Sequence, residues 1–457
     1  MPADHGLASL GLIMQLVGSL FAGYMSLLAI FPIFAGTAGG YLTVFLIGAF
    51  GAVRSLFHRS AGTALLYGSP GGVFRPIYVY AGVSAAQTVA TLLLLNVDAG
   101  IPIQVDLTIA LALMVWPVVL LVLVNRPELR ELADDDALPV AEDFGFEGSA
   151  ALMVLLGLFG ALVALFAVYS SFRLFGSSLG AQGFLVVGVL AMLLARSIIH
   201  TIAGVKGTRG IDSDGATEAA ARYFSFGVVS SVIAGGALLI LFFSMPGIGL
   251  QPAILLLGCA AVYLLLAWPL ILRRFYTERN FSALLSGAEG PSYRRAPDAG
   301  MTAVGWLLLS LGVVQLSLTL PAALTGLGAL GGALRALDPL NTGVGQMAGG
   351  DRSLWWSAGI ALAQVWAGLE LVRMTDRYRI VATIYGAIAS VITLYLMWPE
   401  LRELEQLAAS NGMGGFGSTA SYFRMAMSLL LPIGTIMLAN RKLMPAAQAQ
   451  FRSSVGE

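Results

Sequence analysis

The sequence predicts an all-α polytopic membrane protein with about 12 transmembrane helices, arranged as three parallel four-helix repeats. Composition, a series of long apolar segments and recurring landmarks carry this prediction. Of the 457 residues, 58% are hydrophobic and only 11% are charged, whereas a soluble domain is about one-quarter charged. The 25 acidic and 25 basic side chains are too few to cover a surface that faces water on all sides. A soluble globular protein is therefore excluded.

Twelve segments are apolar over about the 20 residues that a helix needs to cross the hydrocarbon. The first has no basic stretch before it and is too long for a secretion signal, so we expect a retained helix. In chain order the predicted spans are 7–33, 37–57, 76–97, 105–125, 148–170, 180–204, 222–245, 251–273, 300–326, 354–373, 379–398 and 420–440.

Basic residues predict how these spans are oriented. With twelve spans, both termini and five of the loops share one side of the membrane, and lysines and arginines divide 20 to 5 in favour of that side. Basic loops face the cytoplasm, so we expect both termini to be cytoplasmic. All but two of the basic residues are arginines, and alanine and glycine are abundant. This composition is typical of a GC-rich bacterial genome and predicts a multi-pass protein of the bacterial inner membrane.

Landmarks recur in the same order along the chain, as expected for internal repeats. A glycine opens the first helix of each block, an Arg-Ser-x-x-His sequence lies in the second helix of two blocks, an arginine begins each third helix, and a proline lies inside each fourth helix. In that order the landmarks are Gly6, Gly148 and Gly300; Arg54 to His58 and Arg196 to His200; Arg75, Arg222 and Arg379; and Pro117, Pro269 and Pro432.

The landmarks divide the chain into three units. An even number of helices gives every unit the same orientation, so the repeats are parallel rather than inverted. The third unit has diverged: where the others have a histidine, one alignment offers Gln364 and another Asp376. The predicted parts are repeat 1 (1–126), an acidic cytoplasmic linker (127–147), repeat 2 (148–274), a second cytoplasmic linker (275–299), repeat 3 (300–442) and a cytoplasmic tail (443–457).

Two arginine–histidine pairs are the first candidate site. Arg54 and His58, like Arg196 and His200, are four residues apart, so each pair shares one helix face. We expect both pairs at cytoplasmic helix ends, where they could bind an anion, a lipid headgroup or another ligand. The commoner explanation for cations at a membrane edge is that they anchor the helix at the interface.

Proline and intramembrane polar residues give further candidates. Pro117, Pro269 and Pro432 should kink their helices, either as parts of a binding site or for packing alone. Gln364 is one of four deep glutamines, and Glu370 lies towards a cytoplasmic helix end. Glu370 is the best candidate for a coupling acid, although a salt bridge to Arg373 or Arg377 explains it more simply.

Several classes of function have no supporting motif. The lone Cys259 excludes an intrachain disulfide, and three histidines leave little for a zinc site. A dinucleotide-binding glycine loop follows a strand and opens a helix. The glycine-rich run near residue 412 does not follow a strand, so it does not predict a dinucleotide site. The acidic linker is explained by a solvated spacer, although it could dock a basic partner. We therefore predict no catalytic residues, no metal, no cofactor and no nucleic acid.

A weak resemblance adds one expectation. The run from His200 through Gly204 and Gly207 to Arg222-Tyr-Phe-Ser-Phe, and the run from His58 through Gly71-Gly72 to Arg75, resemble the Yip1-type four- or five-helix membrane domains. The resemblance covers about two short patches per unit. It implies membrane organisation or trafficking rather than catalysis.

Two functions fit these observations. One is a non-catalytic membrane scaffold or subunit of a larger membrane complex, with membrane lipids and other membrane subunits as partners. The alternative is a permease-like facilitator that moves a small or lipophilic solute through the seam between repeats. Kinked helices favour the facilitator, whereas the lack of a deep charged residue and the small loops favour the scaffold, which we predict.

Overall fold

In the computed structural model, every regular element of the described residues is an α-helix. The structure describes residues 7–35, 41–67, 72–99, 103–126, 144–175, 180–208, 215–244, 252–278, 299–325, 351–373, 375, 377–410 and 416–440. Most of both predicted linkers, the predicted tail and Asp376 lie outside these residues.

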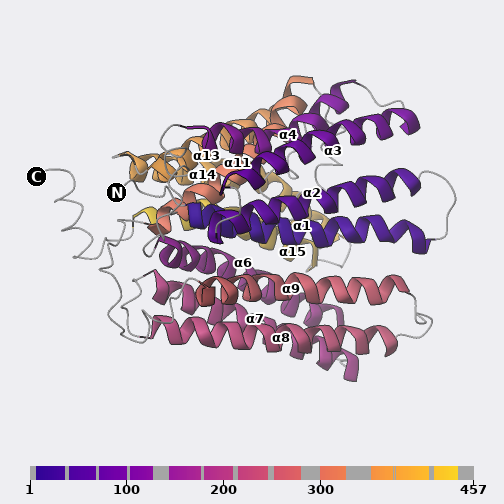
Figure 1. The fold of residues 1–457 in the computed structure, drawn as a ribbon. Helices are drawn as coiled ribbons and strands as arrows, with labels where there is room; N and C mark the ends of the chain where they lie inside the picture. The colour runs from indigo at the N-terminus through magenta and orange to yellow at the C-terminus, as the bar shows by residue number, and fades with distance from the viewer. Residues whose placement is uncertain are drawn as a thin grey trace, which may run out of the picture. The chain divides into compact units, whose positions relative to one another are not determined.

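Each helix in the described residues coincides with one predicted span (Figure 1). The helices are α1 (Leu7–Ala35), α2 (Tyr41–Tyr67), α3 (Arg75–Ala99), α4 (Ile103–Val124), α6 (Phe144–Phe175), α7 (Ala181–Gly207), α8 (Ala216–Ser244), α9 (Pro252–Glu278), α11 (Ala299–Thr325), α13 (Asp351–Arg373), α14 (Tyr378–Ser410) and α15 (Phe416–Ala439).

Length and composition make eight of the described helices candidate membrane spans. Shorter apolar stretches lie in α4 and α15. The chain is therefore a multi-pass helical membrane protein. The eight spans are Leu7–Ile30, Leu42–Tyr67, Arg75–Asn96, Phe146–Phe172, Gly183–Gly207, Glu218–Ile240, Gly300–Ser317 and Tyr378–Trp398.

Several helices extend beyond the apolar segments that predicted them. The helix expected to end at residue 57 continues as α2 to Tyr67, and α14 continues through Pro399 and Arg402 to Ser410. Polar residues end a hydropathy segment, but a helix continues wherever such residues are paired or lie beyond the membrane core. The sequence-based ends at these positions were wrong for that reason.

The chain divides into two compact units. The first comprises residues 1–150 and 206–299, and the second comprises 151–205 and 300–457. Predicted repeats 1 and 3 each fall within one unit, whereas residues of predicted repeat 2 belong to both.

In the first unit, α1 and α2 run side by side (Figure 1) and pack closely through glycine. A Cβ atom on Gly62 would lie 2.7 Å from the Gly11 carbonyl oxygen, and one on Gly11 would lie 2.9 Å from the Gly62 carbonyl oxygen. Small residues allow this approach between membrane helices, where dispersion contacts drive association. Elsewhere in this unit, α3 packs on α2 and α4, and α9 packs on α1 and α8.

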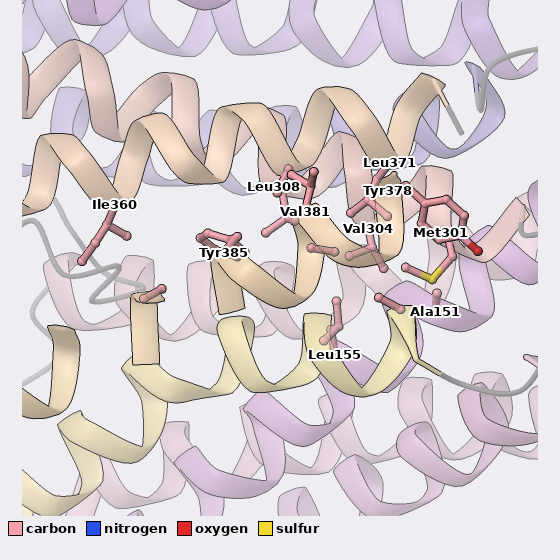
Figure 2. Packing of buried hydrophobic residues seen from close by; sticks show 14 residues of the cluster. Ala151, Leu155, Met301, Val304, Leu308, Ile360, Leu371, Tyr378, Val381 and Tyr385 are labelled. Carbon is pink, nitrogen blue, oxygen red and sulfur yellow. The ribbon is translucent and has the colours of Figure 1, made fainter. Parts of the chain in front are cut away.

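The second unit encloses a hydrophobic core (Figure 2) to which α6, α11, α13, α14 and α15 contribute. Met301, Val304 and Leu308 of α11 recur every three or four residues, as a buried helix face requires. Tyr378 and Tyr385 of α14 meet this face. In this unit α11 and α13 repeat the glycine contact, because a Cβ on Gly368 would lie 2.9 Å from the Gly305 carbonyl oxygen.

Replacing Gly62 with leucine should destabilise the protein. The new side chain must separate α1 from α2, and overpacking of this kind costs about 1–3 kcal/mol. The measurement is the midpoint of thermal unfolding in detergent, followed by tryptophan fluorescence. Gly82→Leu is the matched control, because a Cβ on Gly82 has no atom within 4 Å and leucine favours the helix over glycine. Equal midpoints for the two variants would contradict the close contact.

Candidate functional site

Arg54 and His58 lie deep within α2. The expectation that they mark a cytoplasmic helix end was wrong, because Arg54 is 13 residues from both Tyr41 and Tyr67. At 1.5 Å per residue, about 20 Å separates Arg54 from either end of the helix. His58 is buried and Arg54 is half-buried. Both residues therefore lie within the candidate span Leu42–Tyr67, away from its ends.

The Arg54 guanidinium connects α2 to two neighbouring helices. Its Nε donates to Ser84 Oγ of α3 at 3.0 Å, and one Nη donates to the Leu113 carbonyl oxygen of α4 at 2.6 Å. The same Nη lies 3.4 Å from Tyr80 Oη, and the guanidinium carbon is 5.8 Å from the centre of the Tyr80 ring. One side chain thus holds three helices together.

The Leu113 carbonyl is available because of Pro117. In an α-helix, the N–H of residue 117 would donate to the carbonyl of residue 113. Proline has no N–H, so Pro117 leaves this carbonyl without its helical partner. An unpaired carbonyl in the membrane core costs several kcal/mol. Arg54 supplies the missing donor, and we call the contact between Arg54, Leu113 and Pro117 the proline clamp.

His58 binds the same part of α4 one residue before Pro117. The Trp116 indole Nε1 donates to His58 Nε2 at 3.2 Å, and both side chains are buried. Accepting this bond requires His58 Nε2 to carry no proton. The His58 and Tyr80 rings lie 4.9 Å apart. His58 therefore supports the position of Trp116 next to the proline clamp.

Arg196 and His200 are also inside a helix rather than at its end. They lie in α7, 11 and 7 residues before its last residue, Gly207, and both are buried. The observed helix end lies close to the predicted one at residue 204, and the interfacial position of this pair stays a prediction. Both residues belong to the second compact unit, whereas Arg54 and His58 belong to the first.

The other two predicted prolines also lie inside helices, where they contact glycine. A Cβ on Gly227 of α8 would lie 3.0 Å from Pro269 Cγ. In the second unit, a Cβ on Gly386 of α14 would lie 2.7 Å from the Pro432 carbonyl oxygen. Each of these prolines is a point of close packing between neighbouring helices.

Gln364 and Glu370 both have protein partners. Gln364 is buried and donates to the Leu308 carbonyl oxygen at 3.2 Å. The Glu370 carboxylate accepts hydrogen bonds from Trp366 Nε1, at 3.3 Å, and from the Thr375 hydroxyl. Among the described residues Glu370 forms no salt bridge with Arg373 or Arg377, so the expected ion pair was wrong.

Sequence reasoning missed the polar face of α3. Tyr80, Ser84, Gln87, Thr88 and Thr91 recur at helical spacing and are all buried. This periodicity was a usable signal, because one polar face in an apolar helix predicts contact with polar groups of a neighbour. Gln87 Oε1 and Thr91 Oγ1 have no hydrogen-bond partner within the described part of the chain.

The comparisons leave the family open. No protein-family model, curated protein or solved structure matches this chain.

Arg54 and Pro117 should be energetically coupled. Arg54→Gln should lower the free energy of unfolding by about 1.5–3 kcal/mol, the usual contribution of hydrogen bonds to charged groups. In a Pro117→Ala background the loss should be smaller, because the alanine N–H can bond to the Leu113 carbonyl. A double-mutant cycle measured by chemical denaturation in detergent gives the coupling, which we expect to be about 0.5–3 kcal/mol.

Arg59→Gln is the matched control for this cycle, because Arg59 is exposed on the same helix. Its effect should be small, and it should be the same in the wild-type and Pro117→Ala backgrounds. If Arg54→Gln costs the same with and without Pro117, the guanidinium does not replace the missing backbone donor.

Proposed function

We propose that this chain is a non-catalytic membrane scaffold or a subunit of a larger membrane complex, with lipids and the helices of other subunits as partners. The observation that carries the proposal is the use of Arg54 and His58 inside the fold. Hydrogen bonds to α3 and α4 engage both side chains. A transporter would direct such polar side chains towards a solute. In this chain Arg54 and His58 instead hold helices together.

The outer faces of the helices suit such partners. On α7, Phe184, Ile198 and Ile202 are exposed, and the smaller Gly188 and Ala195 lie exposed between them on the same face. Apolar side chains of this kind suit lipid tails, and small residues allow another helix to approach. Lipid tails and the helices of other subunits are the partners that we propose for this chain.

The alternative is a permease-like facilitator, which two observations favour. Pro117, Pro269 and Pro432 interrupt the backbone hydrogen bonding of their helices. In addition, both amide atoms of the buried Gln315 have no partner among the described residues, as at Gln87 and Thr91. A small polar solute could bind such groups. A facilitator of this type would be driven by the solute gradient alone.

We also propose the three parallel repeats, and the packing of the helices supports them. Gly18, Gly160 and Gly312 hold corresponding places in the first helix of each predicted repeat. A Cβ there would lie 2.7 Å from Arg59 N, 2.7 Å from Ser197 Oγ and 3.1 Å from Val365 N, respectively. Each glycine thus meets the second helix of its own repeat at a similar height.

The same packing favours Gln364 over Asp376 as the counterpart of His58. Gly62 approaches Gly11 as Gly368 approaches Gly305, and Gly11 and Gly305 occupy the same position after the opening glycine of their repeats. His58 is four residues before Gly62, and Gln364 is four residues before Gly368. In this register Ile360 replaces Arg54, so repeat 3 lacks the arginine of the proline clamp.

The charge distribution supports a location in the bacterial inner membrane with both termini in the cytoplasm. This orientation places the N-terminal end of α1 and the C-terminal end of α15 on the same side. Accessibility labelling of single cysteines, in a variant lacking Cys259, tests the proposed side of each loop.

Native mass spectrometry of the full chain, extracted in mild detergent from its own membranes, should detect a stoichiometric protein partner. The physical reason is that exposed apolar helix faces associate with complementary helices. An unrelated multi-pass protein extracted from the same membranes controls for adventitious co-extraction. A chain without a protein partner that carries a small polar molecule would contradict the scaffold and favour the facilitator.

A further inference from the structure

Arg54 places a positive charge near the middle of a membrane span. The span Leu42–Tyr67 contains Arg54 halfway along its length, about 20 Å from each end. A charged side chain at this depth is costly, and such residues usually pair with another group or mark a functional site. Its distance from the helix ends also separates the guanidinium from the level of the lipid headgroups.

The partners of Arg54 do not neutralise its charge. Ser84, Tyr80 and the Leu113 carbonyl are all neutral. The described partners of Arg54 include no carboxylate. A half-buried cation without an opposite charge carries a desolvation penalty that no ion-pair attraction offsets.

Two hydrogen-bond donors beside this charge have no acceptor among the described residues. Arg54 uses Nε and one Nη nitrogen, whereas its other Nη has no partner in the described part of the chain. Tyr80 Oη accepts from Arg54, and its own hydroxyl hydrogen has no described acceptor. Ser84 cannot contribute a donor, because its hydroxyl already donates to the Tyr80 carbonyl oxygen at 2.8 Å.

We propose that the free Nη of Arg54 and the hydroxyl of Tyr80 bind a small, singly charged inorganic anion, such as chloride. The anion would neutralise Arg54 and accept a hydrogen bond from each of the two donors. The proline clamp and Ser84 hold the guanidinium in place. A lipid phosphate does not fit, because its headgroup lies near the helix ends. The bound anion would serve the proposed scaffold as a structural ion beside the contacts that Arg54 makes with α3 and α4.

The test uses the full chain in detergent, with chloride titrated against gluconate at constant ionic strength. A ligand that binds the folded state raises the unfolding midpoint, and above its dissociation constant the stabilisation grows with the logarithm of the ligand concentration. We expect chloride to raise the midpoint of the wild-type protein by about 2–4 °C, equivalent to about 1 kcal/mol in a domain of 150–250 residues. Arg54→Gln should abolish this rise, and Arg59→Gln should preserve it.

Tyr80→Phe tests the site without removing the charge. It keeps the ring beside His58 but lacks the hydroxyl, so half-saturation should require several-fold more chloride. Equilibrium dialysis with radioactive chloride should also show one bound ion fewer per chain in Arg54→Gln. If Arg54→Gln does not fold, Tyr80→Phe by itself tests whether chloride binds at this site. An unchanged chloride response in Tyr80→Phe or Arg54→Gln, or no response in the wild type, would overturn the proposal.

Discussion

The packing of α2, α3 and α4 depends on the hydrogen bond from Arg54 to the Leu113 carbonyl oxygen. Hydrocarbon offers no hydrogen-bond donors, so a backbone carbonyl released by proline must find a protein partner. Pro117 releases this carbonyl, and a side chain from α2 reaches across to it at 2.6 Å. Because the same guanidinium also binds Ser84 on α3, the contact fixes the relative positions of α2, α3 and α4. His58 and Trp116 strengthen the same junction through a second buried hydrogen bond.

Close glycine contacts complement this polar junction. Gly11 and Gly62 bring the backbones of α1 and α2 together in the first unit, as Gly305 and Gly368 do for α11 and α13 in the second. The two kinds of contact act differently. Glycine contacts gain dispersion energy along a whole helix pair, whereas the proline clamp satisfies one specific donor and one specific acceptor. In the proposed alignment, the third repeat keeps the glycine contact but has isoleucine in the place of Arg54, which indicates that glycine packing does not require the clamp.

The candidate site was only partly predictable. Spacing alone placed Arg54 and His58 on one face of α2, and in the structure both side chains contact α4 and Tyr80 of α3. Their distance from the helix end was mispredicted, because the apolar segment was taken to end at residue 57, whereas α2 continues to Tyr67. Tyr80 and Ser84 were overlooked although their helical periodicity was visible. Glu370 was expected to pair with an arginine and instead bonds to Trp366 and Thr375.

Composition and segment length by themselves determined that this chain is helical and crosses a membrane several times, because a span needs a minimum number of apolar residues and its backbone must satisfy its own hydrogen bonds. They also placed Pro117, Pro269 and Pro432 inside helices. Only the tertiary structure decided which donor replaces the one lost at Pro117. That choice depends on how α2 and α4 are rotated and shifted against each other, and residues 59 positions apart in sequence meet only when the helices pack.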